Sequence, residues 1–317
     1  MNRKFVFIFT ATLLIAILAV SASLIVPQSE TISAKELKLE DQFQQLTRNT
    51  DWQQQEEIDL QFDVYHPQGI TRIGDLYYMS SVEIIESTVK YEQPIDGYDR
   101  TPGKGVGHLF VFNQNGELLK DIQLGEGNMY HPGGIDFDGE FIWISVAEYR
   151  PNSESIIYKV DPETMESEEV FRVNDHIGGI VSDEQNGKLY GISWGSRNFY
   201  EWNSKGKERN VQENSSFFID YQDCESVGKD KMVCSGIAGL PTTVGSESYE
   251  LGGVALLDLK TFNTIHEVPV TEFSSQGHVI TRNPVFLENA GQELRLYAVP
   301  DDNDASLLVY ETTNLSN

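Results

Sequence analysis

The sequence has few of the residues that usually reveal a function. It contains two cysteines and six histidines in 317 residues, with neither an HExxH nor a CxxC spacing. The chain therefore carries no ready-made zinc-protease motif and no thiol redox motif. No complete catalytic motif of another kind is present, so the substrate cannot be read directly from the residues.

Basic residues are also scarce. The chain has 23 Lys and Arg against 49 Asp and Glu, which gives a net charge of −26. This charge repels phosphate backbones and anionic lipid headgroups, so we expect no nucleic-acid partner. Because the acids are spread out rather than gathered in an EF-hand-like loop, we interpret them as a solvated surface and not as a calcium store. With 39% hydrophobic residues, the chain can still bury a sizeable core.

Only one long hydrophobic run is present, and it lies at the N-terminus after a basic start. Residues 5–26 are apolar with small polar interruptions. Val20, Ser21 and Ala22 form a small-residue cleavage site, yet the run is also just long enough to span a bilayer. We therefore expect residues 1–26 to be a signal peptide or an uncleaved membrane anchor, with the rest of the chain outside the cytoplasm. Membrane contact is expected only through this segment, and no Cys follows it that could carry a lipid.

A polar region of Gln and Glu follows the hydrophobic run. Within it, "SAKELKLEDQFQQLTRN" has the pattern of a short exposed helix capped by Ser33. We expect residues 27–55 to form a stalk or linker. From residue 56 to residue 317, short β-branched and aromatic runs alternate with Gly, Asn and Asp, and helical periodicity is missing, which indicates an all-β domain.

The all-β region repeats itself. "HPQGITRIGDLYYMSSVE" (66–83) aligns without a gap with "HPGGIDFDGEFIWISVAE" (131–148), and weaker copies begin at 176, 221 and 281. A third β run follows each copy, and a fourth follows all but the last. Four strands per unit at a period of roughly 45 residues are typical of propeller blades.

The last unit lacks its fourth strand, and residues 56–64 have the pattern of an outermost strand. We therefore predict a β-propeller of five four-stranded blades, closed by this N-terminal outer strand, because closure removes open sheet edges. A closed ring of this kind is expected to be a monomer.

In a propeller the first strand of each blade starts at one rim of the central channel. The sequence therefore predicts that His66, His131 and His176 converge there from three successive units. The second strands should end on the same rim, bringing Glu83, Glu148, Arg150, Trp194 and Arg197. We predict these eight residues as the ligand-binding set, with Trp194 providing an aromatic wall for a glycan or peptide.

Three interpretations of the histidines remain open. Imidazoles with nearby carboxylates suit zinc and related ions, so His66, His131 and His176 are candidate ligands of a divalent metal in the channel. The same groups suit general acid and base catalysis, with an arginine holding an anion. In the third interpretation each histidine only bonds to neighbouring backbone where blades meet.

Two further features lie within the repeats. Cys224 and Cys234 flank a predicted hairpin, and their spacing suits a cross-strand disulfide in an oxidising compartment, or else two buried thiols. Residues 89–107 form an insertion between the second and third strands of the first unit. This segment is expected to be a lid over the rim or a disordered surface loop.

The "HPxGI" and "LYxxS" elements resemble an exported bacterial β-propeller family without assigned function, over about residues 56–312. "HPQGITRIGDLYYMSS" is also faintly similar to the first strand of five-bladed glutaminyl cyclases, although His66-Pro67 stands where that family favours an aromatic-Thr pair. Lactonase-type propellers share the layout but have six blades and a channel calcium held by Glu, Asn and Asp, whereas this ring is His-rich. The resemblance implies a fold and transfers no catalytic residues.

Two function classes follow. In the first, the propeller binds a small polar or metal ligand at the top of the channel and serves the cell envelope. In the second, it is an extracellular hydrolase or cyclase that uses His and Glu residues at the same channel mouth. A propeller can perform either function, so the fold alone does not decide between them.

Overall fold

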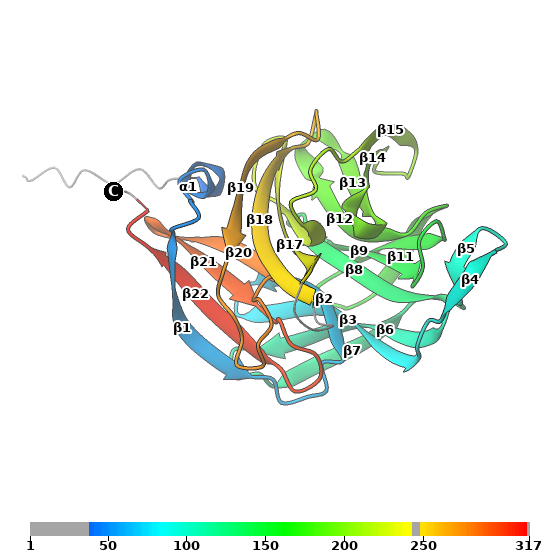
Figure 1. The fold of residues 1–317 in the computed structure, drawn as a ribbon, viewed down its shortest axis with the longest axis horizontal. Coiled ribbons are helices and arrows are strands. Elements are labelled where there is room, and N and C mark those ends of the chain that lie inside the picture. The colour runs from blue at the N-terminus through cyan, green and yellow to red at the C-terminus, as the bar shows by residue number, and fades with distance from the viewer. Residues whose placement is uncertain (1–37, 243–247, 316–317) are drawn as a thin grey trace, which may run out of the picture. The chain divides into compact units, whose positions relative to one another are not determined.

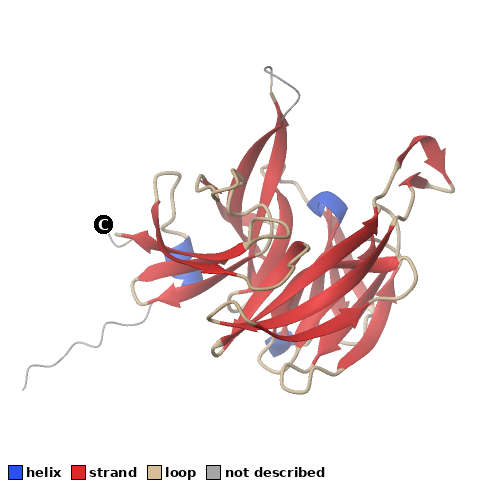
Figure 2. Cartoon of the chain, turned by 90° about the horizontal axis from the view of Figure 1, so that it is seen from below, coloured by secondary structure: helices blue, strands red, loops and turns tan. Residues whose placement is uncertain are grey.

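The structure is a computed structural model that describes residues 38–242 and 248–315. The predicted signal or anchor (1–26) and the predicted helix cap Ser33 lie outside the described residues. Within the part of the chain that is described, no helix has the length and apolar character needed to cross a bilayer. Figure 2 shows that this part consists almost entirely of strands and their connections.

Four-stranded antiparallel meanders are the building unit of the fold. The first follows the order β2-β3-β6-β7 and the fourth the order β16-β17-β18-β19. Their bounds are β2 His66–Ile73, β3 Leu76–Glu86, β6 Lys104–Asn113, β7 Leu118–Leu124, β16 Asp220–Ser226, β17 Lys231–Pro241, β18 Ser248–Asp258 and β19 Thr264–Val270. Neighbouring strands in each unit are antiparallel, and all but β3 and β6, which are separated by β4 (Lys90–Ile95) and β5 (Tyr98–Arg100), are consecutive in the chain.

An eight-stranded sheet contains the second and third units. Its order is β11-β10-β9-β8-β12-β13-β14-β15, and β8 and β12 meet through a single parallel pair, Gly134 and Gly179. The bounds are β8 Met129–Phe137, β9 Ile142–Glu148, β10 Ser155–Val160, β11 Ser167–Val173, β12 Ile177–Asp183, β13 Lys188–Ser193, β14 Asn198–Asn203 and β15 Glu208–Glu213. The turns η1 (Glu184–Asn186) and η2 (Trp194–Ser196) follow β12 and β13. This sheet is thus two meanders joined where their first strands touch.

The last sheet joins strands from both ends of the described chain. Its order is β1-β22-β21-β20, with β1 Asp51–Asp59, β20 Val285–Ala290, β21 Glu293–Ala298 and β22 Ser306–Thr313. Figure 1 shows β1, in blue, beside β22, in red, and the two are antiparallel. The N-terminal strand therefore lies at residues 51–59 and not at the predicted residues 56–64, which places its start within the Gln-rich stretch.

The predicted exposed helical linker is wrong for its described part. Only α1 (Leu39–Phe43) is helical, and it is not a solvated stalk. Phe43 and Leu46 are fully buried in a hydrophobic cluster with residues of β20, β21 and β22. Gln42 donates from its side chain to the carbonyl of Gly291. Residues from 38 onward therefore belong to the folded β unit.

The first strands of the units pack against one another. β2 contacts β8, β16 and β20, while β16 contacts β8, β12 and β20. Glycines in these strands allow this approach, because a Cβ on Gly69 would lie 2.5 Å from the backbone nitrogen of Ile135. A Cβ on Gly134 would lie 2.6 Å from Oδ1 of Asp223. The fold is all-β and propeller-like, and its repeated first strands converge on one central region.

A disulfide joins Cys224 and Cys234, which are direct cross-strand partners in β16 and β17. The hairpin pairing that their spacing suggests is therefore present. Both residues are buried in a cluster with Tyr190, Phe199 and Met232. The bond fixes the first hairpin of the fourth unit.

Candidate functional site

The three predicted histidines lie next to one another. His66 starts β2, His131 lies near the start of β8, and His176 directly precedes β12. The ring centroids of His66 and His131 are 6.3 Å apart, and those of His131 and His176 are 6.0 Å apart. The shared position in the repeat places the imidazoles in a row at the starts of three first strands.

His131, at the centre of the row, is buried and has no polar partner. Neither of its ring nitrogens has a hydrogen bond within the described part of the protein, although the residue is only 5% exposed. One ring face stacks on Tyr149 at a centroid distance of 4.1 Å. Burial, followed by the charges of His176 and His66, lowers the pKa of His131 well below its ordinary value, so the imidazole is neutral. A neutral buried imidazole with two unused nitrogens is costly unless a bound molecule or water pairs with it.

His176 has a structural partner. Its Nδ1 donates to the backbone carbonyl of Glu148 at 2.7 Å. Its ring centroid lies 4.7 Å from that of Trp194, and the two rings are in a T-shaped arrangement. Burial lowers the pKa of His176 to about 4, although the bond to Glu148 acts in the opposite direction. This bond joins the third unit to the second, so His176 fits the interpretation in which a histidine only bonds to neighbouring backbone where blades meet.

His66 is paired with a carboxylate from the last unit. Its Nδ1 lies 2.8 Å from Oδ1 of Asp302, which also accepts a hydrogen bond from the side chain of Asn283 at 3.1 Å. The other carboxylate oxygen lies 3.3 Å from Nη2 of Arg282. Burial alone would raise the pKa of Asp302, but the hydrogen bond and charge of His66, with the charge of Arg282, lower it below its ordinary value. Asp302 is therefore ionised and fixes the orientation of the imidazole.

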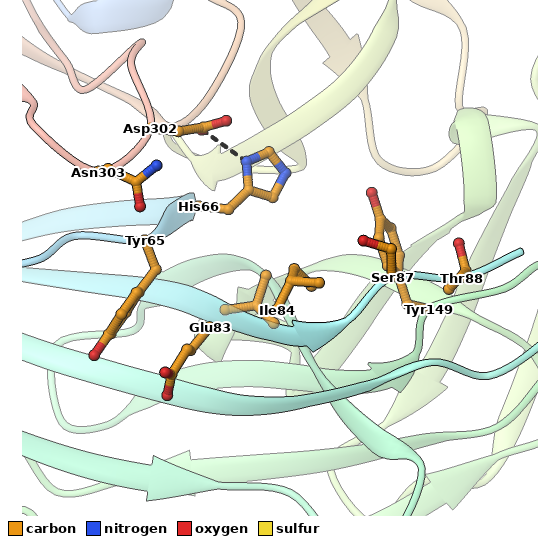
Figure 3. Close-up of a pocket in the computed structure, with 10 residues that line it drawn as sticks. Tyr65, His66, Glu83, Ile84, Ser87, Thr88, Tyr149, Asp302 and Asn303 are labelled. Atoms are coloured by element: carbon orange, nitrogen blue, oxygen red, sulfur yellow. Dashed lines mark hydrogen bonds and ion pairs between the residues drawn. The ribbon is translucent and has the colours of Figure 1, made fainter.

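A cavity of about 630 Å³ opens beside this pair. Figure 3 shows His66 between Asp302 and Asn303 on one side and Ser87, Thr88 and Tyr149 on the other. Tyr65, Val82, Glu83 and Ile84 complete the lining. Burial raises the pKa of Tyr149, so its hydroxyl stays protonated and is a hydrogen-bond donor. The wall therefore offers hydroxyls, one imidazole, one amide and two carboxylates.

The predicted insertion is an ordered hairpin that lies against the site. β4 (Lys90–Ile95) pairs with β5 (Tyr98–Arg100), while the end of the predicted insertion from Lys104 onward already belongs to β6. The guanidinium of Arg100 lies 4.8 Å from the centroid of the Trp194 ring. The guanidinium of Arg150 covers the ring of Tyr98 at 3.4 Å. These cation–π contacts hold the hairpin against the second and third units.

Several predicted site residues have other roles. Glu148 and Arg150 form a buried ion pair. Arg197 lies 3.3 Å from Asp220 and donates to the carbonyl of Gly195, with no contact to the imidazoles among the described interactions. Trp194 is near His176, but Arg100 covers its face, so it is not the open aromatic wall that the sequence predicted.

Glu83 lines the cavity on the side away from Asp302. Figure 3 shows its side chain beside that of Tyr65, and its Oε2 lies 4.0 Å from Nε2 of His108. Glu83 therefore belongs to the cavity wall but not to the row of imidazoles.

The geometry gives no support to a metal held by His66, His131 and His176. Within residues 38–242 and 248–315, no group of three or more His, Cys, Asp or Glu side chains is arranged so that it could hold a metal ion. The three histidines therefore stay a prediction as metal ligands, without a supporting cluster in the described residues.

Three carboxylates where the first strands meet were missed by the sequence reasoning. Asp223 accepts hydrogen bonds from the backbone N–H groups of Ile70 at 2.9 Å and Ile135 at 3.1 Å, so it links β2, β8 and β16. Asp136 accepts from Ser182 and Ser226, and Glu225 accepts from Leu287. These side chains satisfy N–H groups that would otherwise be buried without partners.

Asp136 makes the stability depend on pH. Burial raises its pKa from 3.8 to about 7, against the opposing effect of its bonds from Ser182 and Ser226. The folded state favours the protonated form of Asp136, so protonated Asp136 contributes its full stabilisation below pH 4. This stabilisation is lost as the pH rises through 7. We expect Asp136→Asn to gain stability relative to wild type between pH 4 and pH 7, by up to about 4 kcal/mol. Urea unfolding at both pH values measures this difference, and a pH-independent difference would contradict the assignment.

The sheets and the site together define a class: an all-β, propeller-like protein with a polar cavity at the starts of its repeated strands. The chain belongs to the "Family of unknown function (DUF6454)", whose model matches residues 23–315. The predicted membership of a family without assigned function is thereby confirmed. No curated protein matches the sequence significantly.

Solved structures with similar folds are remote in sequence. A luciferin-regenerating enzyme is 10% identical, with 82% of this chain and 96% of that chain covered and a TM-score of 0.45. The α-L-arabinofuranosidase Arb93A from Fusarium graminearum is 10% identical, with coverage of 81% and 97% and a TM-score of 0.46. U3-55K is 8% identical, with coverage of 80% and 98% and a TM-score of 0.44.

Proposed function

We propose that the protein is an extracytoplasmic propeller that binds a small polar molecule in the cavity beside His66 and Asp302. The observation that carries this proposal is His131, which is buried with both ring nitrogens unused. His131 does not line the cavity itself, but its ring neighbours His66 and Tyr149 both do. A pocket with a few convergent polar groups is the usual form of a small-molecule site.

The proposal includes the arrangement of the ring. Five four-stranded units, with β1 as the outer strand of the last one, form five blades around a channel plugged by Asp223. The pairing of β1 with β22 and the contacts among β2, β8, β16 and β20 support this arrangement. Closure by β1 removes the edge that β22 would otherwise expose.

An oxidising location outside the cytoplasm is also part of the proposal, whether the chain is secreted or anchored by its N-terminal segment. The basic and apolar N-terminus and the Cys224–Cys234 disulfide support it. We expect mass spectrometry of exported protein to find this pair fully oxidised. Replacing both cysteines with alanine should lower the free energy of unfolding by about 2 to 3 kcal/mol. Free thiols in exported protein would contradict the proposed compartment.

Ligand binding can be tested with a variant that fills the cavity. Ser87→Trp should block it, whereas Ser204→Trp, on an exposed turn after β14, is the matched control. A panel of neutral polar metabolites is added, and the melting temperature is measured. At least one compound should raise the melting temperature of wild type and of Ser204→Trp but not of Ser87→Trp, because a ligand stabilises the state that binds it. Shifts that are the same in Ser87→Trp would place binding elsewhere.

The alternative function, an extracellular hydrolase or cyclase, is favoured by a different observation. The Asp302 carboxylate leaves Nε2 as the ring nitrogen of His66 that can accept a proton. The hydroxyls of Ser87, Thr88 and Tyr149 share the same cavity. A binding site of this composition also contains the elements of acid and base catalysis.

A further inference from the structure

We propose that the cavity hydrolyses small neutral carboxylic esters, with His66 as general base and Asp302 as the residue that positions it. This inference rests on the proposed function, because both require a small molecule in the same cavity.

The hydrogen bond between His66 and Asp302 fixes the tautomer of the imidazole. An ionised carboxylate can only accept, so Nδ1 of His66 carries a hydrogen, and in the neutral ring the free lone pair lies on Nε2. His66 lines the cavity, whereas His176 is buried and bonded to Glu148. Among the three imidazoles of the row, His66 thus combines an orienting carboxylate with access to the cavity.

Asp302 is itself held in place. Asn283 donates to Oδ1, Arg282 lies 3.3 Å from Oδ2, and Arg282 also lies 3.7 Å from Glu250. A carboxylate anchored on both oxygens keeps the imidazole in one orientation, as a base that must meet a substrate requires.

The charges around the cavity select the substrate class. The lining contains Glu83 and Asp302 but neither Lys nor Arg. The nearby guanidinium groups are already engaged, since Arg150 pairs with Glu148 and Arg100 pairs with Asp99. Phosphate and sulfate esters would therefore meet negative charge without a cation to compensate.

The carboxylates argue against glycosides. A glycosidase needs two working carboxyl groups, one of which must donate a proton. Asp302 is committed to His66 and Arg282, which leaves Glu83 alone. A neutral acyl compound remains, with the hydroxyls of Ser87, Thr88 and Tyr149 as donors for its carbonyl oxygen.

The reaction balances with water as the only co-reactant. Nε2 of His66 takes a proton from water while the water oxygen forms a bond to the carbonyl carbon, and the carbonyl π pair moves onto oxygen. The carbonyl then re-forms, the bond to the alkoxy oxygen breaks, and the leaving oxygen takes the proton from Nε2. Ester and water become carboxylic acid and alcohol, and His66 returns to its neutral form.

The test measures steady-state hydrolysis of p-nitrophenyl acetate by the intact protein. His66→Asn should lower kcat/KM at least ~100-fold, and Asp302→Asn should lower kcat about 10-fold or more with KM unchanged. His266→Asn is the matched control, because Nε2 of His266 lies 2.7 Å from the carbonyl oxygen of Leu46 and neither residue lines the cavity. Ser87→Trp should lose hydrolysis with His66 intact, which guards against a variant of His66 that fails to fold.

Each outcome decides one of the two proposals. Turnover that is lost in His66→Asn and Ser87→Trp but kept in His266→Asn supports the inference. Turnover no faster than that of an equal concentration of free imidazole, or equal in wild type and His66→Asn, overturns it. If a metabolite still stabilises wild type but not Ser87→Trp in that case, ligand binding stands and only the esterase activity is rejected. If neither hydrolysis nor stabilisation depends on Ser87, both proposals fail.

Discussion

Deleting residues 51–59 should prevent the domain from folding as a soluble monomer. β1 pairs with β22 from Asp51 opposite Thr313 to Asp59 opposite Ser306, and Trp52 is buried against the same sheet. Without β1 the N–H and C=O groups on one side of β22 lose their partners and form an open edge. Size-exclusion chromatography and thermal melting followed by circular dichroism should show aggregation and no cooperative transition.

The control for this deletion begins at Lys38 rather than after residue 50. Phe43 and Leu46 are part of the hydrophobic core, so a chain starting at residue 51 would lose core contacts as well as the residues before Lys38. The chain from Lys38 should stay monomeric and melt cooperatively. A monomeric, cooperatively melting protein without residues 51–59 would show that β1 does not hold the last sheet together.

The second large effect is expected where the first strands meet. Asp223→Ala leaves the N–H groups of Ile70 and Ile135 buried without acceptors, because Asp223 is only 2% exposed and its carboxylate serves both. Each orphaned group costs about 1 to 3 kcal/mol, so the free energy of unfolding should fall by about 3 kcal/mol or more. Asp223→Asn should be less harmful, since its carbonyl still accepts one of the two bonds. Chemical denaturation measures both variants.

An exposed carboxylate provides the comparison for Asp223. Asp304→Ala changes the same side chain on the surface and should leave the unfolding midpoint almost unchanged. If Asp223→Ala melts like Asp304→Ala, then Asp223 does not bind the first strands together, and the region where they meet must be stabilised by apolar packing alone.

The repeated sequence predicted much of the fold because each unit carries its own hairpins. The first strands that start at or beside His66, His131 and His176 lie where the alignment places them, and they approach their neighbours closely at Gly69 and Gly134. The errors fall at the N-terminal side. The Gln-rich residues 51–55 have low β propensity but pair with β22, because an edge strand exposes most of its side chains.

The sequence predicted the position of those site residues that recur at the same place in several units. The row of imidazoles follows from one position that three of the units share. The pairing of His66 with Asp302 depends on units far apart in sequence, and the sequence alone could not join them. Arg100 was missed because it lies in an insertion that has no counterpart in the other units.

The carboxylates where the first strands meet did have a signal in the sequence. Asp136 follows His131 within a first strand, at a position where an apolar side chain is expected. Asp223 and Glu225 lie in the corresponding strand of the fourth unit. An acidic residue inside a buried strand must find donors, and the free N–H groups of neighbouring first strands are the donors that a ring provides.

The most direct test of the site is the protonation pattern of His66, observed by NMR of protein labelled with ¹⁵N-histidine and assigned with His66→Asn. Neutral His66 should carry its hydrogen on Nδ1, bonded to Asp302, with no hydrogen on Nε2. The Nε2 signal should then move when a compound that stabilises wild type but not Ser87→Trp is added. A hydrogen on Nε2 instead of Nδ1, or an Nε2 signal that does not respond to that compound, would contradict the assignment of the cavity as the ligand site.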